Sequence, residues 1–168
     1  MSFIFANIFS FLSLLLLIYS SFKKEKKNML IAQMGNYVFS AIGNLLVGSY
    51  AAASANAISI LRNWIVTKKN NKVIMISIVI GYATIGLLTN KIGIIGLLPT
   101  LASIEYTIFA FFAKTAQQLR YGTIFNLILW LIHDIFVMLY ASIFVDVILL
   151  VVTIISIIKF WNYKEEIK

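Results

Sequence analysis

The sequence contains few of the residues that enzymes use for catalysis. It has no cysteine and a single histidine, which excludes disulfides, thiolate metal sites and cysteine nucleophiles and leaves no ordinary zinc site. The chain also has neither a glycine-rich phosphate loop nor a Gly-x-Ser-x-Gly motif, which argues against ATP-driven pumping and against a serine hydrolase. The sequence therefore predicts a protein that is not an enzyme and that holds no metal or cofactor.

Charged residues are also scarce. They make up 12% of the 168 residues, whereas hydrophobic residues make up 61%; soluble domains usually have about 25% charged and about 45–50% apolar residues. A water-soluble fold could not bury so much apolar surface, so the composition predicts an integral membrane protein whose main partner is the lipid bilayer. We expect only helices, because an open sheet cannot satisfy its backbone hydrogen bonds in lipid.

Seven segments have the length and composition of membrane helices, which need about 20 mostly apolar residues. The expected spans are Phe3–Phe22, Met29–Val47, Tyr50–Thr67, Val73–Thr89, Ile92–Phe112, Leu119–Leu139 and Tyr140–Phe160. The linkers between them are too short to form a soluble domain.

The distribution of basic residues predicts an orientation. With seven spans and the N-terminus outside, every basic residue except Lys91 falls on the cytoplasmic side. These are Lys23, Lys24, Lys26, Lys27, Arg62, Lys68, Lys69, Lys72, Lys114, Arg120, Lys159, Lys164 and Lys168. This is the asymmetry of the positive-inside rule. The net charge of +8 is therefore interpreted as a topology signal, with the C-terminus in the cytoplasm, and not as a sign of nucleic-acid binding.

The chain contains an internal repeat. Shifting the sequence by 90 residues aligns spans one to three with spans five to seven and also aligns the charged turns. Matched pairs include Phe22 with Phe112, Lys24 with Lys114, Asn36 with Asn126, Asn44 with Asp134, Tyr50 with Tyr140, and Asn56 with Asp146. Two lipid-facing bundles could align through composition alone, but matches among scarce polar residues favour a true repeat. The predicted fold is an all-α membrane protein with two parallel three-helix repeats, residues 1–72 and 91–168, joined by a linker helix at 73–90.

Short motifs carry a family resemblance. Asn36, the turn at 46–50, Asn56 and the run Leu61-Arg62-Asn63 make most of the chain similar to the bacterial inner-membrane YgjV family. That resemblance implies a location in the inner membrane of a bacterium.

The 3+1+3 layout resembles, more distantly, the SWEET and PQ-loop (MtN3-like) transporters. This second resemblance implies a site built from the second and third helices of each bundle, with Asn56 and Asp146 at the third-helix positions. The proline motif of the first SWEET bundle is absent, and only Pro99, in span five, could take its place.

Polar side chains inside the spans are the candidate solute-binding residues, because polar groups in hydrocarbon are costly and usually face an interior or a wet cavity. They are Asn36, Ser40, Asn44, Asn56, Asn126, Trp130, Asp134 and Asp146. At about 100° per residue, those of spans two and six lie on one face of each helix. The two faces could share a space that holds a small polar solute. The alternative is that they form hydrogen bonds between packed helices.

Three ionisable residues could couple transport to protons or form a charge pair. His133 adjoins Asp134 and could titrate near neutral pH; the alternative is a satisfied packing pair. Arg62 could pair with Glu105 in span five. Alternatively, Arg62 extends to the cytoplasmic surface by itself, and Glu105 is protonated or faces water.

These observations predict a transporter-like protein that facilitates passage of a small polar solute by alternating access between two pseudo-symmetric bundles. The alternative is a membrane-embedded interaction, effector or sensor protein without transport activity. The short loops favour the transporter, because little surface projects from the membrane to bind partners. Assembly into a homo-oligomer is compatible with either function.

Overall fold

The computed structural model describes residues 2–68, 71–90 and 93–163. Within these ranges the chain forms seven α-helices and one short 3-10 helix, η1 (Ile95–Leu97), and it forms no strand. The α-helices are α1 (Ser2–Ser21), α2 (Lys26–Leu46), α3 (Tyr50–Lys68), α4 (Lys72–Thr89), α5 (Leu98–Phe112), α6 (Ala116–Phe136) and α7 (Tyr140–Lys159). The prediction of an all-helical protein is confirmed.

Four segments are long and apolar enough to cross a membrane. They lie in α1, in α4, in η1 continued by α5, and in α7. The other three helices, α2, α3 and α6, have 19 to 21 residues but are less apolar, because they contain buried arginine and amide side chains. Gln33, Arg62 and Arg120 are examples. The less apolar helices are thus about as long as the four apolar segments.

One helix boundary differs clearly from the prediction. Span five was expected to begin at Ile92, which lies outside the described residues, but α5 begins at Leu98. Gly93 has a positive φ of 69°, which interrupts helical geometry, and Pro99 lies in the first turn of α5, where its missing N–H costs nothing. Pro99 therefore starts the helix and does not form a hinge within it.

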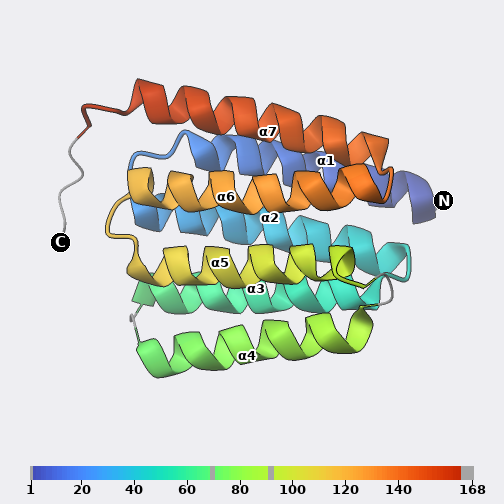
Figure 1. Cartoon of the computed structure of the whole chain (residues 1–168). Helices are drawn as coiled ribbons and strands as arrows, with labels where there is room; N and C mark the ends of the chain where they lie inside the picture. Colours follow the sequence, from blue (N-terminus) through green and yellow to red (C-terminus); the bar gives the residue numbers. More distant parts are fainter. Residues whose placement is uncertain (1, 69–70, 91–92, 164–168) are drawn as a thin grey trace.

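The helices form two rows (Figure 1). The first row consists of α1, α2 and α3, and the second row consists of α7, α6 and α5. Across the rows, α1 contacts α7, α2 contacts α6, and α3 contacts α5, while α4 packs against α3 and α5 at one edge. The N-terminal end of α1 and the C-terminal end of α7 lie at opposite ends of the bundle.

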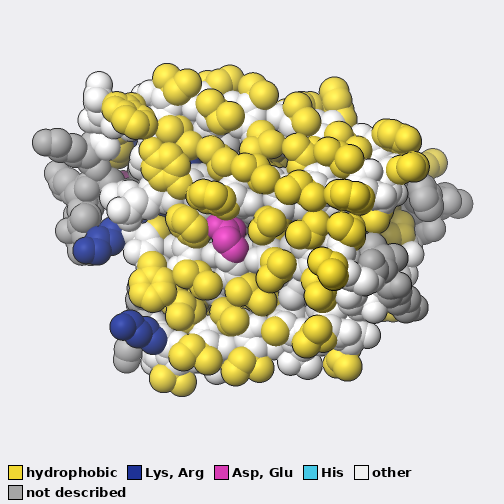
Figure 2. All heavy atoms as spheres, viewed as in Figure 1, with side chains coloured by type: hydrophobic (Ala, Val, Ile, Leu, Met, Phe, Trp, Pro, Cys, Tyr) yellow, Lys and Arg dark blue, Asp and Glu magenta, His cyan; other side chains and the backbone are white. Residues whose placement is uncertain are grey.

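Basic residues gather at one end of the bundle, which we call the basic end. It comprises the loops at 22–25 and 113–115 and the helix ends beside them, and it holds Lys23, Lys24, Lys26, Lys27, Lys68, Lys72, Lys114, Arg120 and Lys159. Lys and Arg side chains are visible only at this end in Figure 2. Lys69, Lys91, Lys164 and Lys168 lie outside the described residues. The described basic residues thus have the one-sided distribution that was predicted.

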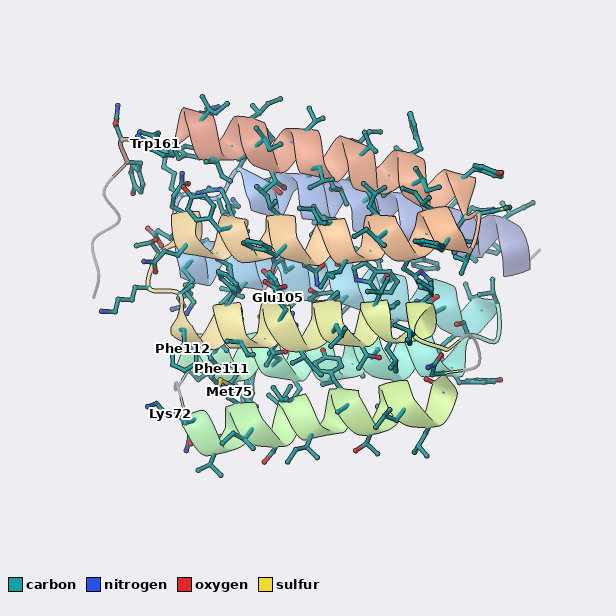
Figure 3. The ribbon with its side chains drawn as sticks, viewed as in Figure 1. Lys72, Met75, Glu105, Phe111, Phe112 and Trp161 are labelled. Atoms are coloured by element: carbon teal, nitrogen blue, oxygen red, sulfur yellow. The ribbon has the colours of Figure 1, made fainter. Side chains whose placement is uncertain are left out.

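The apolar core lies where α5 meets its neighbours. One cluster joins α2, α5 and α6 and includes Met29, Tyr106 and Leu119. A second joins α4 and α5 through Ile78, Tyr82 and Phe111. Figure 3 shows Phe111 with Met75 of α4 beside it. Helix α5 is therefore held by both the first row and α4.

The turns at 47–49 and 137–139 have the same backbone geometry. Ser49 N donates to Asn44 O at 2.8 Å, and the residues 90 positions later repeat this bond at 2.9 Å, from Leu139 N to Asp134 O. Gly48 has φ of 75°, and Met138 has φ of 58°, the one positive value at a non-glycine residue in the described chain. The second turn therefore places a methionine in a backbone conformation that favours glycine.

Reciprocal substitutions at these turns should change stability in opposite directions. Gly48→Ala should lower the free energy of unfolding by about 1 kcal/mol, and Met138→Gly should raise it by up to about 1 kcal/mol, because only a side chain is strained at positive φ. Space is not the limit, since nothing lies within 4 Å of a Cβ built at Gly48 and Met138 is 68% exposed. Denaturant titration in detergent would measure both; a loss of stability in Met138→Gly would contradict the strain argument.

Two glycines of α4 provide a matched test of helix packing. A Cβ at Gly86 would lie 2.0 Å from Thr100 Oγ1 in α5, whereas a Cβ at Gly81 would meet nothing within 4 Å. Gly86→Ala should therefore destabilise the protein by about 1–3 kcal/mol through overpacking. Gly81→Ala should be neutral or stabilising by up to about 1 kcal/mol, because alanine favours helix. Equal effects of the two substitutions on thermal unfolding would contradict the close α4–α5 contact.

Candidate functional site between the helix rows

Arg62 of α3 is the centre of a buried polar group. Its side chain is 1% exposed, its Nε donates to Asn63 Oδ1 at 2.9 Å, and its Nη2 donates to Tyr37 Oη at 3.0 Å. The guanidinium carbon lies 4.7 Å from the ring centre of Tyr106 and 5.5 Å from that of Tyr37. Among the described residues, no carboxylate lies within 4 Å of Arg62. A guanidinium has more N–H donors than these two bonds use.

Two amide side chains extend this group across the rows. Asn63 Nδ2 donates to Gln33 Oε1 at 3.2 Å and to Leu30 O at 3.3 Å. Tyr106 Oη of α5 donates to the same Gln33 oxygen at 2.8 Å. We call Arg62, Asn63, Gln33, Tyr37 and Tyr106 the Arg62 cluster. It joins α2 and α3 of the first row to α5 of the second.

The Arg62 cluster compensates a buried charge without an acid. A cation inside a membrane protein is costly unless it is hydrogen-bonded or paired. Here two hydrogen bonds and two aromatic faces, which attract cations through their quadrupoles, replace the ion pair. The arrangement can therefore stabilise a hydrogen-bond acceptor or a negative group placed beside the guanidinium.

A second polar bond lies beside the cluster, between α3 and α4. Ser59 Oγ and Tyr82 Oη are 2.6 Å apart, and both side chains are buried. Tyr82 Oη also donates to Ala55 O at 3.4 Å. This bond links the helix at the edge of the bundle to the helix that contains Arg62.

The residues predicted on α6 and α7 form a separate group at the other end of the bundle. His133 Nδ1 lies 2.7 Å from Asp134 Oδ1, and the rings of Trp130 and His133 meet edge to face at 5.9 Å. Asp134 also interacts electrostatically with Asp146 of α7, whose Oδ2 is buried without a hydrogen-bond partner among the described residues. The predicted packing contact between His133 and Asp134 is present.

Asn36 and Asn126, which are 90 residues apart in the sequence, each form hydrogen bonds between helices. Asn36 Nδ2 donates to Ser13 O at 2.9 Å and to Ser13 Oγ at 2.7 Å. Asn126 Nδ2 donates to Ala102 O at 2.9 Å. This is the packing alternative stated for both residues. The bonds of Asn36 join α2 to α1, and the bond of Asn126 joins α6 to α5.

The structure does not unite the other predicted solute-binding residues. Ser40, Asn44 and Asn56 are half-buried, and their side chains form no hydrogen bond within the described part of the chain. Asn56 lies on α3 and Asp146 on α7, which are not neighbours in the bundle (Figure 1). A common space between Asn56 and Asp146 stays a prediction.

Arg62 and Glu105 form no salt bridge within the described part of the chain. Arg62 donates to Asn63 and Tyr37, and both carboxylate oxygens of Glu105 lack a hydrogen-bond partner among the residues that the structure describes. The two charges nevertheless interact electrostatically. A direct pair between them stays a prediction.

Four members of the Arg62 cluster were not predicted as site residues: Gln33, Tyr37, Asn63 and Tyr106. Gln33 and Asn63 are amides within apolar spans, which is the same signal that selected Asn36 and Asn56. Tyr106 lies in the middle of α5, and a central tyrosine is not an interfacial anchor. The central position of Tyr106 could have indicated from the sequence that its hydroxyl forms a buried hydrogen bond.

Comparison with protein families identifies the chain. A family model described as a bacterial inner membrane protein, Imp-YgjV, matches residues 4–164. The chain belongs to this family. The match covers all seven helices apart from the first two residues of α1, and the family description agrees with the apolar helices in indicating a membrane location.

Searches of curated proteins and of solved structures give no match.

Removing one hydroxyl tests the bond that crosses the rows. Tyr106→Phe keeps the ring over Arg62 but deletes the donor to Gln33, so it should lower the free energy of unfolding by about 0.6–1.5 kcal/mol. Tyr140→Phe is the matched control, because Tyr140 is 74% exposed, and it should change stability by less than about 0.5 kcal/mol. Denaturant titration in detergent measures both. Equal effects would show that the buried hydroxyl contributes nothing.

Proposed function

We propose that this protein is a non-enzymatic transporter that facilitates passage of a small polar solute across the bacterial inner membrane. The Arg62 cluster is the observation on which the proposal rests. It combines a guanidinium, two amides and two phenols at the contact between the rows, and such donors can replace the water around a polar solute. We place the solute at this cluster and not at Asn56 and Asp146.

The proposed architecture is two parallel three-helix repeats with α4 as linker. A shift of 90 residues makes α1, α2 and α3 equivalent to α5, α6 and α7. The contact between α1 and α7 is then equivalent to the contact between α5 and α3, and the contact between α2 and α6 is equivalent to itself. The equivalent turns at 47–49 and 137–139 have the same hydrogen bonds. This pattern supports a pseudo-two-fold axis along the membrane normal, as in transporters with parallel repeats.

We further propose that all seven helices cross the membrane, with the N-terminus outside and the basic end in the cytoplasm. Arg62 lies six residues before Lys68, the last residue of α3. The Arg62 cluster then lies in the cytoplasmic half of the membrane, which makes the cytoplasm the nearer aqueous phase for a bound solute.

Cross-row bonds at the basic end supply a closed gate in this proposal. Lys26 Nζ donates to Ala113 O at 2.6 Å, and Arg120 donates to Ser21 O at 2.9 Å and to Lys23 O. Lys23 and Ala113 are 90 residues apart and lie in equivalent loops. A basic side chain of each row therefore binds the loop of the other row. We call these bonds the clasp. Rocking the rows apart at this end would break the clasp and admit water to the Arg62 cluster.

Thiol labelling tests this proposal, because the chain has no native cysteine. Thr123 of α6 is buried and interacts with Tyr106, so Thr123→Cys places a thiol beside the cluster. In cells or oriented vesicles, a membrane-impermeant maleimide should label it from both sides if access alternates. Arg120→Gln, which removes part of the clasp, should raise the labelling rate from the cytoplasmic side about tenfold or more.

Matched variants define the baseline for labelling. Lys114→Gln removes a charge from the same end without touching the clasp, and it should leave the rate unchanged. Ile80→Cys lies on the outer face of α4 at 59% exposure and should stay unlabelled from water. Ser49→Cys and Thr115→Cys lie in loops at opposite ends and should each label from one side only. A Thr123→Cys thiol that is inaccessible from both sides, with and without Arg120→Gln, would reduce the Arg62 cluster to a packing role.

A further inference from the structure

The outer face of the second row contains a groove that the solute pathway does not use. Its volume is about 320 Å³, and it is lined by Leu101, Ile104, Glu105, Ile108 and Phe109 of α5 and by Leu129 of α6. Figure 2 shows one acidic side chain in the middle of this otherwise apolar face, and Figure 3 shows Glu105 midway along α5 on the side of α6. Five of the six lining side chains are thus hydrocarbon, and the sixth is a carboxylate.

The carboxylate of Glu105 has no hydrogen-bond partner. Both oxygens are buried and lack a hydrogen bond within the described chain. Arg62 interacts with this charge electrostatically but forms no salt bridge with it among the described residues, and it donates to Asn63 and Tyr37. An ionisable group in hydrocarbon is costly unless something compensates it. Packing alone therefore does not explain why a glutamate occupies this position.

The depth of Glu105 limits what can reach it. Glu105 is the central residue of α5, which runs from Leu98 to Phe112, so seven residues, or about 10 Å of helix, separate it from either end. The groove opens on the apolar face. Hydrophilic ions would have to cross lipid to enter it, whereas a hydrophobic ion dissolves in the bilayer and can diffuse to it.

We propose that this groove binds hydrophobic cations from the lipid phase, such as aryl or alkyl ammonium and phosphonium ions. The Glu105 carboxylate neutralises the positive centre, and the leucine and isoleucine side chains bury the hydrocarbon substituents. The ring of Phe109 adds an aromatic face that attracts a cation. A hydrophobic anion gains the same apolar contact but is repelled by the carboxylate.

This site is tested separately from the proposed solute pathway. Glu105 interacts electrostatically with Arg62, but no member of the Arg62 cluster lines the groove, so the groove can bind its ligand whether or not the rows alternate. Failure of the thiol-labelling experiment would leave this proposal intact, and the reverse also holds.

A pair of probes with the same shape and opposite charge tests the proposal. Binding of tetraphenylphosphonium and tetraphenylborate to the purified full-length chain in detergent is measured by equilibrium dialysis, with empty micelles subtracted. The wild type should bind the phosphonium at least about tenfold more tightly than Glu105→Gln does. Glu25→Gln, which removes a carboxylate in the exposed loop before α2, is the matched control and should bind like the wild type.

A second pair of variants tests the walls of the groove and leaves the charge unchanged. Leu101→Trp fills the groove and should weaken phosphonium binding, whereas Leu87→Trp, on the exposed face of α4, should not. This pair keeps the test decisive even if Glu105→Gln proves unstable.

Two results would overturn the proposal. One is equal phosphonium binding by the wild type and by both groove variants. The other is equally tight binding of tetraphenylborate, which would make the groove a nonspecific apolar surface. If the wild type binds neither probe and a Leu101→Cys thiol forms disulfide-linked dimers, a second copy of the chain occupies the groove in place of a cation.

Discussion

The burial of the Arg62 guanidinium is the constraint on which the interior of this protein depends. A cation at this position must be solvated by the protein, and the atoms that do so come from three helices. Asn63 and Tyr37 accept its hydrogen bonds, while the ring of Tyr106 faces its charge. Because Tyr106 also donates to Gln33, the contact between the two rows and the solvation of Arg62 are one network. Cluster residues cannot be replaced independently of one another.

Polar residues, more than apolar ones, define the inside of this bundle. In lipid, an exposed leucine costs no more than a buried one, so hydrophobicity does not decide which helix face packs inward. Large aliphatic and aromatic side chains are accordingly exposed on all seven helices. The helices that bury arginine or amide side chains, α2, α3 and α6, are also those with the lowest hydropathy, and two of them are the central helices of the rows.

The sequence was sufficient to predict the helices but not their partners. Helix positions followed from the lengths of apolar runs, and the exception, α5, begins late because Gly93 and Pro99 act together before its first turn. The angle of a side chain around its helix was predictable, but the identity of the facing helix was not. For that reason the sequence did not show that α3 and α7, which contain Asn56 and Asp146, are not in contact with each other.

The groups that compensate the buried charge of Arg62 could not be predicted from the sequence either. An arginine in span three and a glutamate in span five suggested an ion pair, yet Arg62 is solvated by an amide and two phenols, which do not differ in sequence from packing residues. The contact between His133 and Asp134 was easier to foresee, because both residues lie on one helix. Interactions within a helix are encoded locally, whereas those between helices depend on packing.

The placement of Arg62, Glu105, Asp134 and Asp146 also makes the two rows electrically unequal. At six or more residues from the ends of the described helices, the first row holds the cationic group of Arg62, and the second row holds the carboxyl groups of Glu105 and Asp146; Asp134 lies in the last turn of α6. If the rows slide past one another along the membrane normal, ionised groups move through the transmembrane field, at about 2.3 kcal/mol per elementary charge per 100 mV. Any such motion is therefore electrogenic, and the membrane voltage would set the balance between its end states.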